Sequence, residues 1–142
     1  MKKVRDILEV KGRDVWSIGP DASVFDALKI MADKDVGALV VLDGGNLVGI
    51  ISERDYARKI ALLGRASLTT QVKEIMTTDV VCVDPEQNVD ECMAVVTEKR
   101  IRHLPVLENG ELIGLISIGD LVKSIITEQQ FIIEQLERYI TG

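Results

Sequence analysis

The sequence predicts an α/β (α+β) fold in which a βαββα unit occurs twice and an extended C-terminal helix follows. Two observations support this prediction. Residues 17–57 align with residues 82–122 at a constant offset of 65 without a gap. In both copies, short apolar runs alternate with turn residues and with stretches whose apolar residues have helical spacing. Because a fold that repeats must repeat its elements, each element of one copy predicts a counterpart in the other.

Composition favours a compact globular protein. The chain has 142 residues, of which 46% are hydrophobic, 28% charged and 4% aromatic, so we expect an aliphatic core. A repeat of about 60 residues would bury only ~60% of its unfolded surface by itself and would be marginally stable. We therefore expect the two repeats, residues 1–66 and 67–142, to fold together.

Charge and missing motifs argue against several classes of function. The net charge of −6 disfavours nucleic acid and anionic membranes as partners, and no apolar run is long enough to span a bilayer. Cys82 and Cys92, expected on a strand and a helix, have no metal-ligand spacing and indicate buried thiols in a reducing compartment, so we expect a cytoplasmic protein without a metal site. No hydrolase, Walker A or zinc-protease motif is present, which makes an enzyme the weakest hypothesis and predicts no catalytic cofactor.

The elements of each copy follow the same order. A short helix and a short β-like run come first, and Pro20 or Pro85 ends the run. A side-chain oxygen followed three residues later by a carboxylate then predicts a capped helix start, at Ser23 and at Asn88. Two strands and a second helix follow, with glycine in the turn between the strands. The predicted segments are helices at 4–8 and 72–76, β-like runs at 15–18 and 80–83, helices from 23 and 88, strands at 38–42, 47–51, 104–107 and 112–116, and helices from 52 and 117.

The last helix is expected to be longer than its counterpart and to extend from about Asp120 to Tyr139. Its apolar residues alternate steps of four and three, which is the spacing of a coiled-coil seam with one polar break. Fewer than three heptads leave two interpretations open, a helix packed against its own domain or a contact between two copies of the chain. Two apolar edges favour the second interpretation and a homodimer. The seam comprises Val122, Ile126, Gln129, Ile133, Leu136 and Ile140, and it is widened by Ile125, Ile132 and Tyr139.

The most informative motif consists of a glycine, two apolar residues, Ser, two further residues and Asp. It contains Ser52 and Asp55 in the first copy and Ser117 and Asp120 in the second. Two such βαββα repeats, with the run Lys-Arg-Ile-Arg-His-Leu-Pro-Val at 99–106, resemble a tandem pair of cystathionine-β-synthase (CBS) domains, also called a Bateman module. The resemblance covers nearly the whole chain and is to a stand-alone module. It implies two repeats that pack through their sheets about a pseudo-two-fold axis.

The resemblance also implies an adenosine-containing ligand in the cleft between the repeats: AMP, ADP, ATP, NAD(H) or S-adenosylmethionine, with AMP favoured. In this family the Asp of the motif accepts hydrogen bonds from ribose hydroxyls, the Ser holds the ribose or phosphate, and basic residues at the second strand meet phosphates. By position, the implied residues are Asp55, Asp120, Ser52, Ser117, Arg102 and His103. The base pockets would be lined by residues around Thr78, Val81, Leu115 and Ile116 in one site, and around Val15, Trp16, Ile50 and Ile51 in the other.

A capping box is the alternative interpretation of the motif, because Ser and Asp three residues apart also satisfy backbone N–H groups at a helix start. Two observations favour a ligand. The motif recurs in both copies, and Gly119 stands in a first helical turn, where glycine lowers helix stability by ~1 kcal/mol. The basic cluster at 99–103 has the alternative interpretation of a solvated strand entry. Trp16 is expected in the core, although its place beside the first pocket would make it a reporter of ligand.

The two predicted sites are not equivalent. Where the second copy has Arg102 and His103, the first has Gly37 and Ala38, and Arg54 is the cation that would compensate. We therefore expect one strong site, built on Asp120 and Arg102. The favoured hypothesis is a homodimeric regulatory module that binds an adenosine ligand and signals to an unidentified protein target. The alternative is a ligand-independent dimeric interaction module.

Overall fold

The computed structural model describes residues 2–141. They form two compact units, one made of Val15–Val81 and the other of the residues up to Asp14 together with those from Cys82 onwards. This division differs from the predicted repeats at 1–66 and 67–142. The segment at the start of the first repeat, residues 3–11, packs onto the second repeat. The segment at the start of the second repeat, residues 71–77, packs onto the first.

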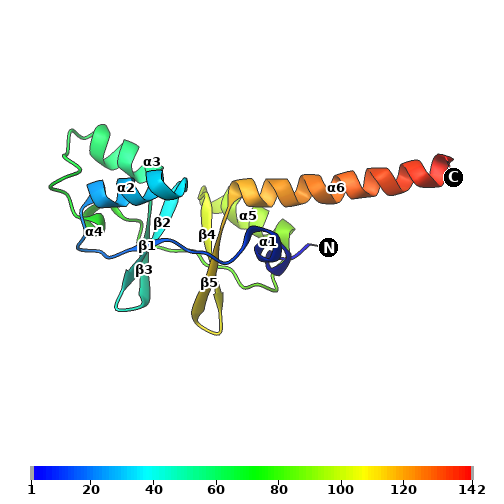
Figure 1. Cartoon of the computed structure of the whole chain (residues 1–142), viewed down its shortest axis with the longest axis horizontal. Coiled ribbons are helices and arrows are strands. Elements are labelled where there is room, and N and C mark those ends of the chain that lie inside the picture. The colour runs from blue at the N-terminus through cyan, green and yellow to red at the C-terminus, as the bar shows by residue number, and fades with distance from the viewer. Residues whose placement is uncertain (1, 142) are drawn as a thin grey trace. The chain divides into compact units, whose positions relative to one another are not determined.

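The unit Val15–Val81 is built on a three-stranded sheet in the order β1-β2-β3. β1 (Ser17–Ile18) is parallel to β2 (Ala38–Asp43), which is antiparallel to β3 (Asn46–Ser52). The helices α2 (Val24–Lys34), α3 (Glu53–Tyr56) and α4 (Val72–Ile75), with the π-helix η1 (Ala57–Ala61), lie on one face of this sheet (Figure 1). The core between them is aliphatic, as predicted, and includes Ile18, Val24, Ala27, Met31, Leu39, Val41, Ile51, Ile60, Val72 and Ile75.

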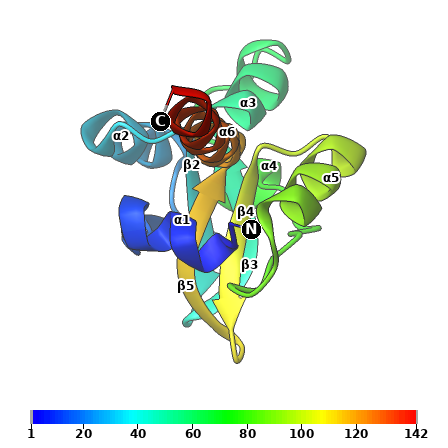
Figure 2. The same ribbon diagram turned by 90° about the vertical axis from the view of Figure 1, so that its right-hand side faces the viewer.

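The other unit is built on a two-stranded antiparallel sheet, β4 (His103–Glu108) and β5 (Glu111–Ser117). Figure 2 shows its three helices, α1 (Val4–Lys11), α5 (Val89–Lys99) and α6 (Ile118–Thr141), in front of the two strands. The first half of α6 packs against α5, α1 and β5. The mixed α/β fold with its long C-terminal helix therefore agrees with the prediction.

Local sequence signals position most of these elements. The Ser23 Oγ accepts from the backbone N–H of Asp26 (3.0 Å), and the Asn88 Oδ1 accepts from that of Glu91 (2.8 Å), so both predicted helix caps are confirmed. The hairpin loops are the two-residue turns 44–45 and 109–110. All four residues have positive φ, between 53° and 86°, as a type I′ turn requires.

One predicted strand is missing. The first β-like run forms β1, but the run 80–83 contributes only an isolated bridge between Val83 and Val106. The backbone N–H of Val80 donates to the carbonyl of Thr78 (2.9 Å), so the run begins in a tight local turn that removes a donor from strand pairing. The expectation that Cys82 lies on a strand is therefore wrong.

The two segments that exchange repeats are residues 3–11 and 71–77, which we call the first and second arm. The helix in each arm starts at a loop of the repeat that it covers. The N–H of Val4 donates to the Gln87 carbonyl (2.9 Å), and that of Val72 donates to the Ala22 carbonyl (2.8 Å). Because the acceptors Gln87 and Ala22 are equivalent positions of the two copies, the arms occupy equivalent places in the two units.

Each arm lies directly against a glycine of a hairpin. A Cβ built on Gly114 would lie 2.6 Å from Leu8 Cδ2 of the first arm. A Cβ built on Gly49 would lie 2.7 Å from Met76 Sδ and 3.0 Å from the Thr77 carbonyl oxygen of the second arm. Close packing of the arms therefore favours glycine at both positions: a side chain at Gly49 would press on the backbone of the second arm, and one at Gly114 would push the Leu8 side chain of the first arm aside.

We expect Gly49→Ala to lower the free energy of unfolding by about 1–3 kcal/mol, because the added methyl meets a backbone carbonyl that cannot rotate away. Urea denaturation followed by circular dichroism measures this change. The matched control is Gly19→Ala, whose Cβ would have nothing within 4 Å. Equal stability of the two variants would contradict the packing of the second arm described above.

Candidate functional site

The Ser-x-x-Asp motif forms a capping box in both copies. The backbone N–H of Ser117 donates to Asp120 Oδ2 (2.8 Å), and the N–H of Asp120 donates to Ser117 Oγ (3.2 Å). The same reciprocal bonds join Ser52 and Asp55, at 3.0 Å and 3.2 Å. The capping interpretation is confirmed, so any ligand role of these side chains would be additional to a structural one.

The β4–β5 hairpin places the predicted cations beside the second motif. His103 is the direct partner of Ser117 across the two strands, and the N–H of Ile118 donates to the carbonyl of Arg102 (2.8 Å). Arg102 is exposed and His103 is half-buried. The structure thus places the backbone of Arg102 and His103 beside Ser117 and Asp120 at the start of α6, where backbone N–H groups also favour an anion.

The equivalent place in the other unit has the same backbone geometry with different side chains. Ala38 is the direct partner of Ser52, and the N–H of Glu53 donates to the Gly37 carbonyl (3.1 Å). Gly37 and Ala38 thus stand where the second copy has Arg102 and His103. Arg54 is half-buried in the first turn of α3. This edge therefore has no cation from its strand.

Asp120 has a partner that the sequence did not suggest. The ammonium of Lys11, in α1, lies 2.6 Å from Asp120 Oδ2 and also donates to the carbonyl of Leu115 (2.7 Å). Burial by itself would raise the pKa of Asp120. The hydrogen bonds from Lys11 and from the Ser117 backbone, together with the positive charge of Lys11, outweigh burial and hold this pKa below its ordinary value.

Asp55 is more enclosed than Asp120. Its Oδ1 lies 3.2 Å from the ammonium of Lys59 and accepts from Thr77 Oγ1 (3.4 Å), while Oδ2 also accepts from Ser52 Oγ (3.1 Å). The side chain of Asp55 is 12% exposed, against 23% for Asp120. Of the two carboxylates, Asp120 is therefore the more accessible to a ligand.

Four other predicted residues differ in burial and in the unit to which they belong. The side chain of Ile116 is fully buried in the core, and its place in a base pocket stays a prediction. Trp16 is 38% exposed, with the Lys34 ammonium 4.5 Å from its ring centre, and it is not the core residue that we expected, because only Ile18 of its run is buried. Thr78, which is exposed, and Val81, which is half-buried, belong to the unit Val15–Val81.

Three side chains that contact the motif carboxylates were missed by sequence reasoning: Lys11, Lys59 and Thr77. Lys59 follows Asp55 by four residues on a helical segment, which is a recognisable ion-pair spacing. Lys11 and Asp120 are 109 residues apart, and their contact depends on the exchanged arm. No pattern in a single sequence gives that contact.

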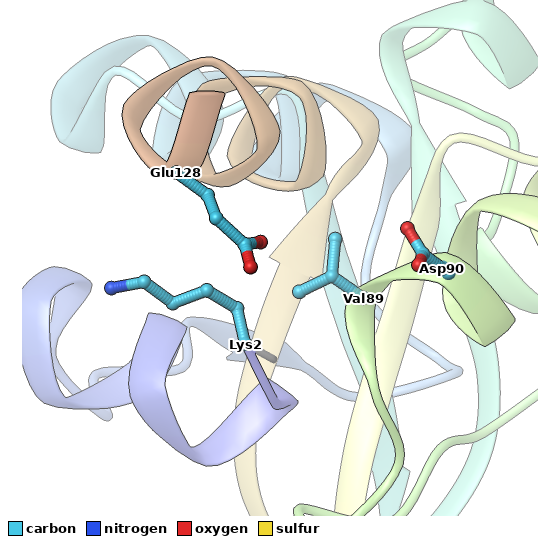
Figure 3. A pocket seen from close by; sticks show the side chains of 4 residues that line it. All are labelled: Lys2, Val89, Asp90 and Glu128. Atoms are coloured by element: carbon cyan, nitrogen blue, oxygen red, sulfur yellow. The ribbon is translucent and has the colours of Figure 1, made fainter. Parts of the chain in front are cut away.

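Other surface and buried features offer little for catalysis. A hollow of about 240 Å³ is lined by Lys2, Val89, Asp90 and Glu128, and Figure 3 shows Glu128 projecting from α6 towards Lys2 and Val89. None of these four belongs to the predicted site.

Burial, with the neighbouring Glu91 carboxylate, raises the pKa of Cys92 to about 11, so its thiol is unreactive. Across residues 2–141, no helix is long and apolar enough to cross a membrane, and no three acidic, His or Cys side chains could hold a metal.

Known proteins resemble this chain over most of its length. The mitochondrial CBS domain-containing protein CBSX3 of Arabidopsis thaliana is 40% identical over 98% of this chain and 72% of its own length. The structure of a protein with CBS domains from Burkholderia ambifaria matches with a TM-score of 0.87 and 53% identity, covering 90% of this chain and 96% of that one.

Two more distant structures share the fold. A CBS domain pair solved in complex with 5′-methylthioadenosine and S-adenosyl-L-methionine matches with a TM-score of 0.79 and 24% identity, covering 90% of this chain and 98% of that one. A hexameric CBS-CP12 protein from cyanobacteria matches with a TM-score of 0.77 and 32% identity, covering 84% of this chain and 66% of that one.

The family model of the CBS domain matches twice, at residues 4–62 and 72–127. These two ranges fall in the two predicted repeats, and each contains one copy of the Ser-x-x-Asp motif. The chain belongs to the CBS domain family and is a tandem pair of CBS domains, a known regulatory module.

Proposed function

We propose that this protein is a sensor that binds an adenosine-containing ligand at the start of α6, with AMP the first candidate, and passes the change to a protein target. The observation that carries the proposal is the convergence of Arg102, His103, Ser117 and Asp120 at one helix start. The CBS pair crystallised with 5′-methylthioadenosine and S-adenosyl-L-methionine supports adenosine as the shared part of the ligand.

The chemistry of the four side chains fits a nucleoside phosphate. A carboxylate accepts hydrogen bonds only, so Asp120 suits the two vicinal hydroxyls of a ribose. A guanidinium and a helix N-terminus suit a phosphate, and Arg102 lies beside the first turn of the 24-residue helix α6. ADP, ATP, NAD(H) and S-adenosylmethionine remain candidates, because they share the adenosine. Asp55, with Ser52 and Arg54, would form a weaker second edge.

Lys11 supplies a route by which binding would be communicated. Its ammonium bonds both the Asp120 carboxylate, which is the predicted ribose acceptor, and the Leu115 carbonyl. A ribose that takes the Asp120 carboxylate must replace Lys11, so it would bind better to an arrangement in which the end of the first arm has moved. Differential affinity for two arrangements is what a ligand needs in order to shift a protein between them.

A second candidate function is a ligand-independent interaction module. The observation that favours it is the row of exposed apolar side chains along α6, including Ile126, Phe131 and Leu136. We propose a homodimer in either case, since this surface is present with or without a ligand. The hexameric CBS-CP12 protein shows that a protein of this fold can assemble. A cytoplasmic location stays a prediction.

Titration calorimetry of the full chain with AMP, ADP, ATP, NAD(H) and S-adenosylmethionine tests the sensor. We expect saturable heat for at least one of them and an affinity lowered roughly tenfold or more in Asp120→Ala, because hydrogen bonds to a charged group are lost. Glu91→Ala is the matched control, since Glu91 completes the capping box of α5.

Glu91→Ala should lose about 1 kcal/mol of stability and Asp120→Ala about 1–2 kcal/mol, because it also loses the ion pair with Lys11, and only Asp120→Ala should lose affinity. Equal affinity of Asp120→Ala and Glu91→Ala would assign the motif to capping alone. No heat with any of the five ligands would leave the interaction module as the function.

The phosphate contact is tested by comparing AMP with adenosine. We expect Arg102→Ala to weaken AMP binding roughly tenfold and to leave adenosine binding nearly unchanged, because only AMP carries the anion that the guanidinium pairs with. Lys99→Ala, a nearby lysine on α5, is the control. Equal losses for AMP and adenosine would show that Arg102 acts on the fold of the site.

The Lys11–Asp120 ion pair is tested through the pH dependence of stability. The folded pKa of Asp120 is lowered, so its stabilising contribution is complete above its unfolded value of about 3.9 and is lost as the pH falls through the folded pKa. Lys11→Met should lower the free energy of unfolding near pH 7 by up to about 1 kcal/mol and make the loss below pH ~4 smaller. Urea denaturation at several pH values, with Lys99→Met as control, checks this. Parallel profiles for wild type and Lys11→Met would contradict it.

A further inference from the structure

The C-terminal half of α6 has no cover within its own unit. From Gln129 to Thr141 every residue is exposed, and this half extends beyond the rest of the unit (Figure 1). The interpretation that the helix packs against its own domain is therefore wrong for this half, and only Leu121, near the start, is fully buried. The exposed fractions of the apolar seam residues are large: Val122 41%, Ile126 60%, Ile133 47%, Leu136 55% and Ile140 79%.

The exposed residues have the order of a heptad repeat. Ile126, Ile133 and Ile140 occupy the a positions, and Val122, Gln129 and Leu136 occupy the d positions. The e positions on one flank are polar: Lys123, Gln130 and Glu137. The g positions on the other flank are apolar or aromatic: Ile125, Ile132 and Tyr139. Each flank of the seam thus has its own chemistry, which restricts the surfaces that can cover it.

We propose that α6 pairs with α6 of a second copy of this chain in antiparallel orientation. In an antiparallel pair, each a residue packs in a layer with a d residue of the partner. One register uses the whole seam, and it places Ile126 with Leu136, Ile133 with Gln129, and Ile140 with Val122 of the partner helix. This inference rests on the proposed homodimer and is independent of the nucleotide.

Charge complementarity selects the antiparallel orientation. In this register the e positions of the two helices are neighbours, so Lys123 lies beside Glu137 of the partner helix, and the two-fold symmetry forms this ion pair twice. Gln130 then meets its own counterpart. In a parallel pair, each e position would face a g position, so Lys123 and Glu137 would face isoleucines. They would also lie 14 residues apart along the axis, about 21 Å, and no ion pair would form.

The apolar flank fits the same register. The g positions are also neighbours in an antiparallel pair, so Ile125 meets Tyr139 of the partner helix and Ile132 meets its own counterpart. The contact is therefore wider than the a and d residues alone. Gln129 is the polar break, and because it packs against Ile133 of the partner helix in this register, it lowers the stability of the pair.

A membrane surface fits the exposed face less well. A helix that lies on a membrane carries a polar face rich in Lys and Arg, which anionic lipids attract. The polar residues around this seam include Glu128, Glu134 and Glu137, against Lys123 and Arg138. This excess of negative charge favours a protein surface, and the self-complementary order of the flanks favours a second copy.

The oligomeric mass of the full chain is the first test. By light scattering after size exclusion, the wild-type chain should have the mass of two chains, and Ile133→Asp should have the mass of one. The control is Phe131→Asp, at a residue that is 60% exposed but lies on the opposite face of α6 at an f position, and it should remain a dimer.

The possible results separate the two proposals. A monomeric wild type would overturn both the homodimer and the helix pair. A dimeric Ile133→Asp would leave the homodimer standing and overturn the pairing of α6. Dissociation of both variants to the same extent would show that the seam is not the contact, because the two aspartates lie on opposite faces.

Charge reversal tests the orientation. Lys123→Glu and Glu137→Lys should each raise the dimer dissociation constant roughly tenfold, because each converts two attractive pairs into two repulsive ones. The double variant restores opposite charges in the antiparallel register and should return within about threefold of wild type. Sedimentation equilibrium measures these constants, and circular dichroism confirms that each variant is folded. Additive losses in the double variant would overturn the antiparallel register.

Discussion

The close packing of the two arms on Gly49 and Gly114 is the constraint on which the rest of the structure depends. A side chain at either position would overlap Met76 or Leu8. A repeat of about 60 residues is marginally stable by itself, and an arm completes the core of each unit, since Val4 and Leu8 in one unit, with Val72 in the other, are almost completely buried. The motif glycines thus serve the fold first and the candidate site second.

Sequence patterns predicted the parts of the fold that depend on neighbours along the chain. The caps at Ser23 and Asn88 and both hairpin turns form because the groups that bond lie a few residues apart. The repeat allowed each element to be predicted from two copies. The prediction failed at 80–83, where a local hydrogen bond of Val80 replaces strand pairing. It also failed at Trp16, where apolar character alone suggested burial.

The candidate site was only partly predictable, because only contacts between residues that are close along the chain leave a pattern in the sequence. Alignment of the copies identified Ser117 and Asp120, and the register of a hairpin brings His103 to them. Lys11 reaches Asp120 only because the first arm belongs to the unit of the second repeat. The electrostatics of the carboxylate therefore depend on the exchange of arms, which is a property of the tertiary structure and leaves no local pattern.

The two motif carboxylates differ in what a ligand would have to displace. The ion-pair partner of Asp55 is Lys59, four residues away on the same helical segment, so its replacement need not disturb any other element. The ion-pair partner of Asp120 is the last residue of α1, so its replacement acts on an arm that completes the core of the unit. Asp120 also lies in the first turn of α6, whose other end carries the exposed seam. Because Asp120 and the exposed seam lie on one continuous helix, a change in the direction of α6 at Asp120 would also move the seam. A ligand at Asp55 has no such connection.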